Sequence, residues 1–189
     1  MAKLNDRLKN AISALPGKEK DKLLFRLVAK DAKLIRRLEF ELLEGGETRD
    51  DRSQELRDNI VKNLAKSGDD VMTPGWVLME LRFWNARITE HVQATKDKEG
   101  EVALTLFMLN ESLRRHRAMI LRYPDHRSAT LADYLVRRAD ALMTKAGKLH
   151  EDLRWELRKD MNELLAHIWA IPRSAKLAGP FGLPKEWAG

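Results

Sequence analysis

Apolar side chains recur at every third or fourth position along most of this chain. The clearest stripe consists of Val77, Leu81, Trp84, Ile88 and Val92. Because an α-helix has 3.6 residues per turn, this spacing gathers the apolar side chains on one face, which another element must cover. No segment shows the sustained alternation of apolar and polar residues that is typical of a strand. We therefore predict an all-α fold.

Proline and glycine divide this pattern into about seven helices. Pro16-Gly17 and Gly45-Gly46 are expected to end helices, since Pro cannot continue the hydrogen-bond ladder and Gly adopts the turn that follows. Thr73-Pro74 predicts a helix start, with Thr as the N-cap and Pro in the first turn. Tyr123-Pro124 predicts an interruption, because the residue before Pro disfavours the α conformation. The expected architecture is an irregular multi-helix bundle or a short α–α stack.

Three regions are expected along the chain. Residues 1–72 are predicted to form a short-helix region, residues 73–171 a long-helix bundle core, and residues 172–189 a Pro/Gly-rich extended tail. A short charged turn within 76–121 joins two long amphipathic helices and predicts an antiparallel hairpin. The tail carries large apolar residues, so we expect it to pack on its own chain. Docking into a groove of another chain is the alternative.

Composition narrows the class of protein. Apolar residues make up 43% of the chain and charged residues 34%, so a core can form beneath a heavily charged surface. The chain has no Cys, which excludes disulfides, thiolate metal ligands and thiol catalysis. It lacks a signal-peptide pattern, and no apolar run approaches the roughly 20 residues of a membrane span. We expect a cytoplasmic protein that does not bind a membrane.

The net charge of +6 is unevenly distributed. Residues 1–44 hold 11 basic and 7 acidic residues, and residues 111–148 hold 9 basic and 4 acidic residues. In the second block, the possible contacts with an anion or a nucleic acid are Arg114, Arg115, Arg117, Arg122, Arg127, Arg137 and Arg138. The guanidinium group suits phosphate and carboxylate pairing. The alternative is an ordinary solvated surface whose cations pair with nearby acids.

Catalytic and metal-binding patterns are absent from the sequence. Glu163 and His167 share a helical face, but a second pair of this kind, which a bundle metal site requires, does not occur. His116 continues an apolar seam and is interpreted as a core residue. Gly45-Gly46 is not followed by Lys and Ser or Thr, so it does not form a phosphate-binding loop. We predict no metal, no cofactor and no assignable catalytic residue.

Large aromatic residues near the C-terminus are the second group of candidates for partner contact. They are Trp155, Trp169, Phe181 and Trp187. We interpret Trp155 and Trp169 as a widening of the buried face of the last long helix. An exposed strip for a partner is the alternative, since Trp is enriched at the centres of protein interfaces.

The leading hypothesis from the sequence is a non-enzymatic helical binding or scaffolding protein with a protein partner or self-association. One alternative is a nucleic-acid-associated protein that uses residues 114–138, whose binding would weaken steeply with salt. Another alternative is a helical-bundle enzyme or ligand carrier with a site between Trp84 and His116.

Overall fold

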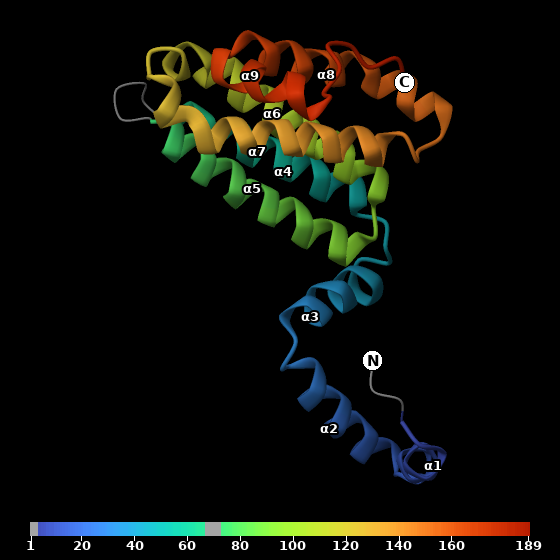
Figure 1. Ribbon diagram of the computed structural model, residues 1–189. Helices are drawn as coiled ribbons and strands as arrows, with labels where there is room; N and C mark the ends of the chain where they lie inside the picture. The colour runs from blue at the N-terminus through green and yellow to red at the C-terminus, as the bar shows by residue number, and fades with distance from the viewer. Residues whose placement is uncertain (1–3, 67–72) are drawn as a thin grey trace.

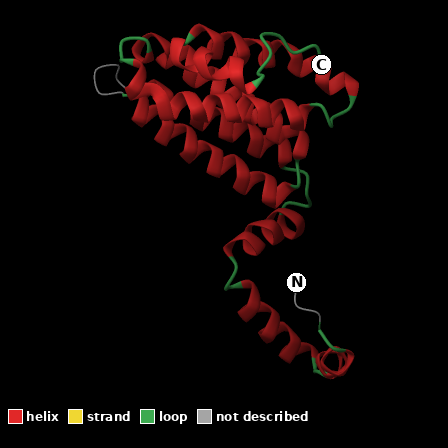
Figure 2. Cartoon of the chain, in the orientation of Figure 1, coloured by secondary structure: helices red, strands yellow, loops and turns green. Residues whose placement is uncertain are grey.

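A computed structural model describes residues 4–66 and 73–189, and within these ranges it contains helices and no strands (Figure 2). The all-α prediction is therefore confirmed for the described part of the chain. These residues form nine α-helices and one π-helical turn, so the expected count of about seven is too low. The elements are α1 (Asp6–Ala14), α2 (Gly17–Val28), α3 (Ala32–Leu38), η1 (Glu39–Leu43), α4 (Arg49–Lys66), α5 (Pro74–Thr95), α6 (Lys98–Ile120), α7 (Asp125–Ala146), α8 (Glu151–Ala170) and α9 (Pro172–Phe181).

The hairpin of α5 and α6 forms the centre of the bundle. α6 contacts α4, α5, α7 and α8, and its side chains are buried on several sides. Leu106, Leu109 and Leu113 are fully buried there. The charged turn at Lys96 and Asp97 caps the end of α5 and the start of α6. Lys96 takes a left-handed conformation after α5, and the Asp97 side chain accepts a hydrogen bond from the Gly100 backbone N–H at 2.8 Å. These caps satisfy backbone groups that the helix ends leave unpaired.

The C-terminal region corrects the expected extended tail, because residues 172–181 form helix α9. Pro172 lies in the first turn, where a missing backbone N–H has no effect on the ladder. The buried Ala178 packs this helix into the bundle. Gly182, with φ +81°, then ends it: the Gly182 and Leu183 N–H groups donate to the carbonyls of Gly179 and Ala178. Only the residues after this turn are extended, and they lie along α8 of the same chain (Figure 1).

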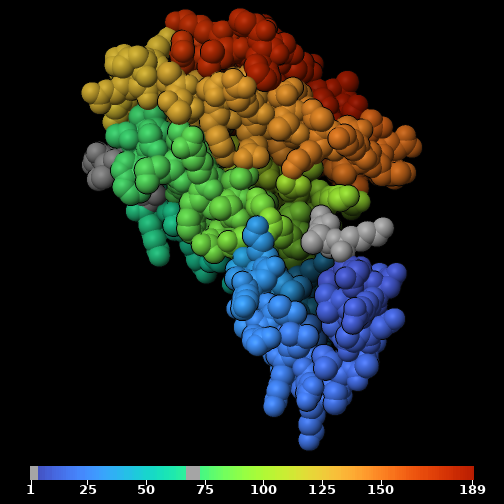
Figure 3. Space-filling view, turned by 60° about the horizontal axis from the view of Figure 1, so that its bottom comes forward, coloured from blue at the N-terminus to red at the C-terminus, as the bar shows by residue number. Residues whose placement is uncertain are grey.

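The first two helices lie outside the bundle. α1 and α2 contain no buried residue, and they project from the end of the body where α3 packs on α5 (Figure 1). In the space-filling view, the blue N-terminal segment forms a protrusion beneath the green and orange body (Figure 3). α4, in contrast, packs on α6 and buries Ile60 completely. In the described residues, no helix is long and apolar enough to cross a membrane.

Candidate functional site

The projecting segment, residues 4–30, is the most exposed part of the molecule, and we call it the arm. Residues close in the sequence set the bounds of its two helices. Asn5 caps the start of α1, because its side-chain oxygen accepts a hydrogen bond from the Leu8 backbone N–H at 2.8 Å, and Pro16 separates α1 from α2. The arm nevertheless exposes large apolar side chains: Leu4 (52% exposed), Leu8 (45%), Leu24 (53%), Phe25 (67%) and Leu27 (53%). Contiguous exposed apolar surface on a folded protein marks an interaction site.

The arm also carries most of the excess positive charge. Residues 1–30 contain 8 of the 35 basic residues and 3 of the 29 acidic residues of the chain, and all of these except Lys3 belong to the arm. Residues 31–189 therefore contain 27 basic and 26 acidic residues, so the rest of the chain is nearly neutral. A basic segment with exposed apolar side chains favours a partner that offers both an apolar surface and carboxylates.

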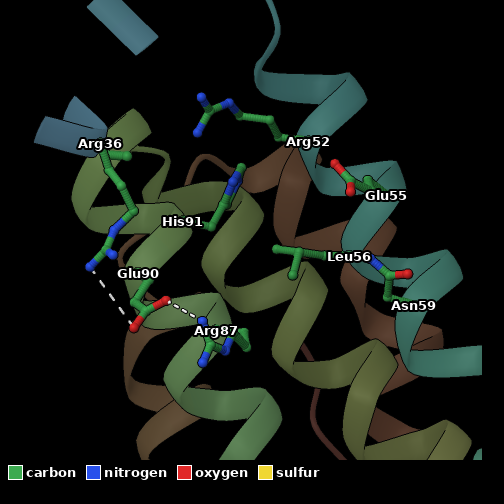
Figure 4. A pocket seen from close by; sticks show the side chains of 9 residues that line it. Arg36, Arg52, Glu55, Leu56, Asn59, Arg87, Glu90 and His91 are labelled. Atoms are coloured by element: carbon green, nitrogen blue, oxygen red, sulfur yellow. Dashed lines mark hydrogen bonds and ion pairs between the residues drawn. The ribbon is translucent and has the colours of Figure 1, made fainter. Parts of the chain in front are cut away.

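A pocket of about 210 Å³ lies at the root of the arm, between α3, α4 and α5 (Figure 4). α3 contributes Arg36, α4 contributes Arg52, and α5 contributes Arg87, Glu90 and His91. The Glu90 carboxylate forms an ion pair with Arg87 at 3.0 Å, and it lies 3.9 Å from the Arg36 guanidinium. Glu90 therefore connects α5 with α3, the helix that follows the arm. The Arg36–Glu90 contact thus adds to the packing of α3 on α5 at the root of the arm.

Arg52 completes the root from the other side. It forms an ion pair with Glu44, and its guanidinium lies 5.4 Å from the centre of the buried Phe40 ring in η1. Hydrogen bonds from Arg52 and then from Thr48 lower the pKa of the Glu44 carboxyl to about 2. The carboxylate is therefore charged over the whole physiological range, and the ion pair persists there.

His91 is the one titratable ring in this pocket. It is buried, and the Ser53 hydroxyl lies 3.2 Å from its Nε2 atom. Burial lowers the pKa of His91, with a smaller opposing effect from Asp97. The three arginines of the pocket each lie near a carboxylate of the protein itself.

The seven arginines expected to form one basic patch are divided by the fold. Arg114 donates two hydrogen bonds to Glu163 of α8, at 2.5 and 2.6 Å, and also pairs with Glu111. These contacts raise the pKa of Arg114, with the Glu163 hydrogen bonds as the largest cause. Arg115 is exposed on the same helix.

The remaining arginines of this set differ in their surroundings. Arg137 pairs with Asp133 at 2.9 Å, and the Arg138 guanidinium lies over the Tyr134 ring. Of the seven candidates, Arg117, Arg122 and Arg127 are exposed and form no ion pair with the described residues. They lie where α6 ends and α7 begins, so the structure leaves a small basic corner rather than a continuous patch.

The four aromatic candidates also separate. Trp155 is 75% exposed on α8, whereas Trp169 of α8 and Trp187 of the C-terminal segment are half-buried against the core. The Trp169 indole donates to the Pro184 carbonyl at 3.1 Å. Phe181 is 43% exposed, with Arg137 over its ring. Trp155 is thus the member of this group with most of its surface open to a partner.

His116, expected to be a core residue, and His167, which shares a helical face with Glu163, both lie near acids. His116 is completely buried, with its Nε2 3.6 Å from a Glu80 carboxylate oxygen, and His167 lies 3.4 Å from Glu163. Burial lowers the pKa of His167. Across residues 4–66 and 73–189, no three His, Asp or Glu side chains are grouped as a metal ion would require.

The arm was not singled out by the sequence, where its apolar stripe resembles any core-facing helix. The signal that identifies it is the combination of that stripe with the charge excess of residues 1–30. Comparison with protein-family models, with curated proteins and with solved structures finds no match to this chain.

Proposed function

We propose that this chain is a non-enzymatic helical binding protein in which the arm is the docking element and the bundle is its scaffold. The observation that supports this most directly is that α1 and α2 bury no residue while exposing Leu24, Phe25 and Leu27. Burial of an apolar side chain of this size contributes roughly 1.5–3 kcal/mol, which the isolated chain does not gain at these positions. A partner surface would supply that burial.

The root of the arm supports the same proposal. The Arg36–Glu90 contact and the packing of α3 on α5 hold α3, the helix that follows the arm, against the body. A docking element that is oriented before binding loses less conformational freedom when it binds. The nearly neutral bundle beneath it, with its buried leucine core, serves as the rigid support.

An affinity capture with matched variants tests the proposal. The full chain is incubated with nuclease-treated lysate of cells that express it, and captured proteins are identified by mass spectrometry and then bound again in purified form. Phe25→Asp combined with Leu27→Asp is expected to abolish binding of the captured partner. Leu121→Asp, a change at a 48% exposed residue of the body, is the control and should retain it.

The outcome is decisive because these residues are exposed and their replacement leaves the core intact. A partner that binds the arm variant as strongly as the unaltered chain would contradict the proposal. Loss of folding in the variant, monitored by circular dichroism, would show instead that the arm contributes to the core.

Nucleic-acid association is a second candidate, supported by the unpaired arginines Arg117, Arg122 and Arg127. Electrostatic binding of this kind would weaken with salt at a log–log slope of roughly −0.9 per phosphate contacted in duplex DNA. Replacing all three with Ala should then reduce the affinity and the slope. The absence of binding at low salt would remove this candidate.

A further inference from the structure

We propose that the partner of the arm is a second copy of this chain, whose body receives the arm in a groove formed by α4, α6 and α8. This inference rests on the proposed function, because it names the occupant of the same docking element. Two copies would exchange arms, each placing its α2 on the body of the other.

The groove lies between the N-terminal halves of these three helices and has a volume of about 260 Å³. Its apolar lining consists of Leu104, Leu149, Leu153 and Leu157. Leu153 and Leu157 are four residues apart on α8 and lie on one face of it, whereas Leu149 precedes the helix; all three are only half-buried. This volume suits a large apolar anchor side chain of a partner, such as Phe or Leu.

The charged lining of the groove is predominantly acidic. It contains Asp50, Asp97, Glu99 and Glu156, against Arg49 and Arg57. Both arginines are engaged: Arg49 pairs with Asp50 at 3.0 Å, and Arg57 lies 4.7 Å from the centre of the Phe107 ring. Glu99 and Glu156 have no ion pair within the described residues. The groove therefore offers apolar surface beside more carboxylates than cations, although Arg49 interacts electrostatically with Asp97 and Glu99 as well as with Asp50.

The arm presents the complementary surface. Leu24 and Phe25 are exposed on α2, Arg26 directly follows Phe25, and Lys22 lies two residues before Leu24. An apolar anchor flanked by cations matches an apolar groove flanked by carboxylates, and this match favours both burial and correct orientation. Because both surfaces occur on the same chain, a second copy offers a groove to the first copy's arm and an arm to the first copy's groove.

The arm and groove of one molecule are kept apart by the root. The packing of α3 on α5 and the Arg36–Glu90 contact direct α2 away from the body, as Figures 1 and 3 show. Pairing of two arms with each other would bring two basic segments together, which the charge opposes. Reciprocal exchange between arm and groove avoids this repulsion and closes with two-fold symmetry.

Light scattering coupled to size-exclusion chromatography of the full chain tests this assignment over a range of protein concentrations. We expect the mass to rise from that of one chain to that of two, and added salt to weaken the dimer because the contact is partly ionic. Phe25→Asp in the arm and Glu99→Lys with Glu156→Lys in the groove should each raise the dimer Kd by about tenfold or more. Leu121→Asp should leave it unchanged.

A charge exchange makes the test specific to this pairing. Lys22→Glu with Arg26→Glu should weaken the dimer alone and restore it when combined with the two groove substitutions. A chain that stays monomeric at every concentration, a dimer insensitive to the groove substitutions, or a failure of the exchange to restore association would each overturn the inference.

The result is distinguishable from failure of the proposed function. If the chain is monomeric but captures another protein through Phe25 and Leu27, the docking function stands and self-association is wrong. If neither association depends on these residues, both proposals are wrong.

Discussion

The side chain of Asn162 in α8 and the backbone of Trp187 exchange two hydrogen bonds. The Trp187 N–H donates to Oδ1 of Asn162 at 2.7 Å, and Nδ2 of Asn162 donates to the Trp187 carbonyl at 3.3 Å. Because both residues are partly shielded from water, the pair ties the C-terminal segment to the middle of α8 and positions Leu183, which is buried on the same side of the bundle.

Asn162→Ala should therefore release this segment and lower the free energy of unfolding. Two neutral hydrogen bonds contribute roughly 1–3 kcal/mol together. Urea denaturation measures the change, and hydrogen exchange at Trp187 reports the release directly. Glu186→Gln, at an exposed neighbouring residue, is the control. An unchanged midpoint with unchanged exchange would show that the segment is held by its apolar contacts alone.

Leu109→Ala in the centre of α6 should lower the free energy of unfolding by about 2–5 kcal/mol, because the side chain is completely buried and its removal leaves a cavity. Leu121→Ala lies directly after the same helix but is 48% exposed, so it should have a much smaller effect. Thermal or chemical denaturation of the two variants compares them. Equal effects would mean that α6 is rotated from the orientation described.

Gly100→Ala should weaken the start of α6, although Ala is the better helix former. A Cβ atom at this position would collide with the Asp97 carboxylate, which accepts from the Gly100 N–H as the helix cap. Loss of such a cap lowers stability by roughly 0.5–2 kcal/mol. Gly75→Ala in the first turn of α5 is the matched control, since its Cβ would make an ordinary 3.7 Å contact. A Gly100→Ala protein as stable as Gly75→Ala would contradict this account.

Stability should fall on acidification below neutral pH. Burial lowers the pKa of His91 and of His167 from the ordinary value of 6.5, so the unfolded chain binds more protons than the folded one in that range. The free energy of unfolding therefore rises with pH there, and the contribution is lost as pH falls through the lowered pKa values. Glu163, whose pKa is lowered by the hydrogen bonds from Arg114, adds to the loss in more acidic solution.

Denaturation between about pH 7.5 and pH 5 measures this slope. His91→Gln and His167→Gln should each reduce it. If neither histidine variant changes the dependence of the free energy of unfolding on pH, other groups cause that dependence.

The helical class could be predicted because it depends on local order. The spacing of Val77, Leu81 and Ile88 makes an apolar face on any helix, and Thr73-Pro74 and Asp97 act on backbone groups within a few residues. α9 was missed for a related reason: Pro172 and Pro180 suggest an extended chain, and only the burial of Ala178 against the bundle favours the helix.

The sequence by itself determined the helical class, the amphipathic faces of the long helices and the charge excess near the N-terminus, because these follow from backbone periodicity and side-chain type. Tertiary structure alone decided which faces are covered. The stripe through Leu24 and Leu27 has the same pattern as the one through Leu106 and Leu109, yet the first stays open and the second is buried. Burial depends on which helices meet in space, and that is set by contacts such as α3 on α5 between residues far apart in the chain.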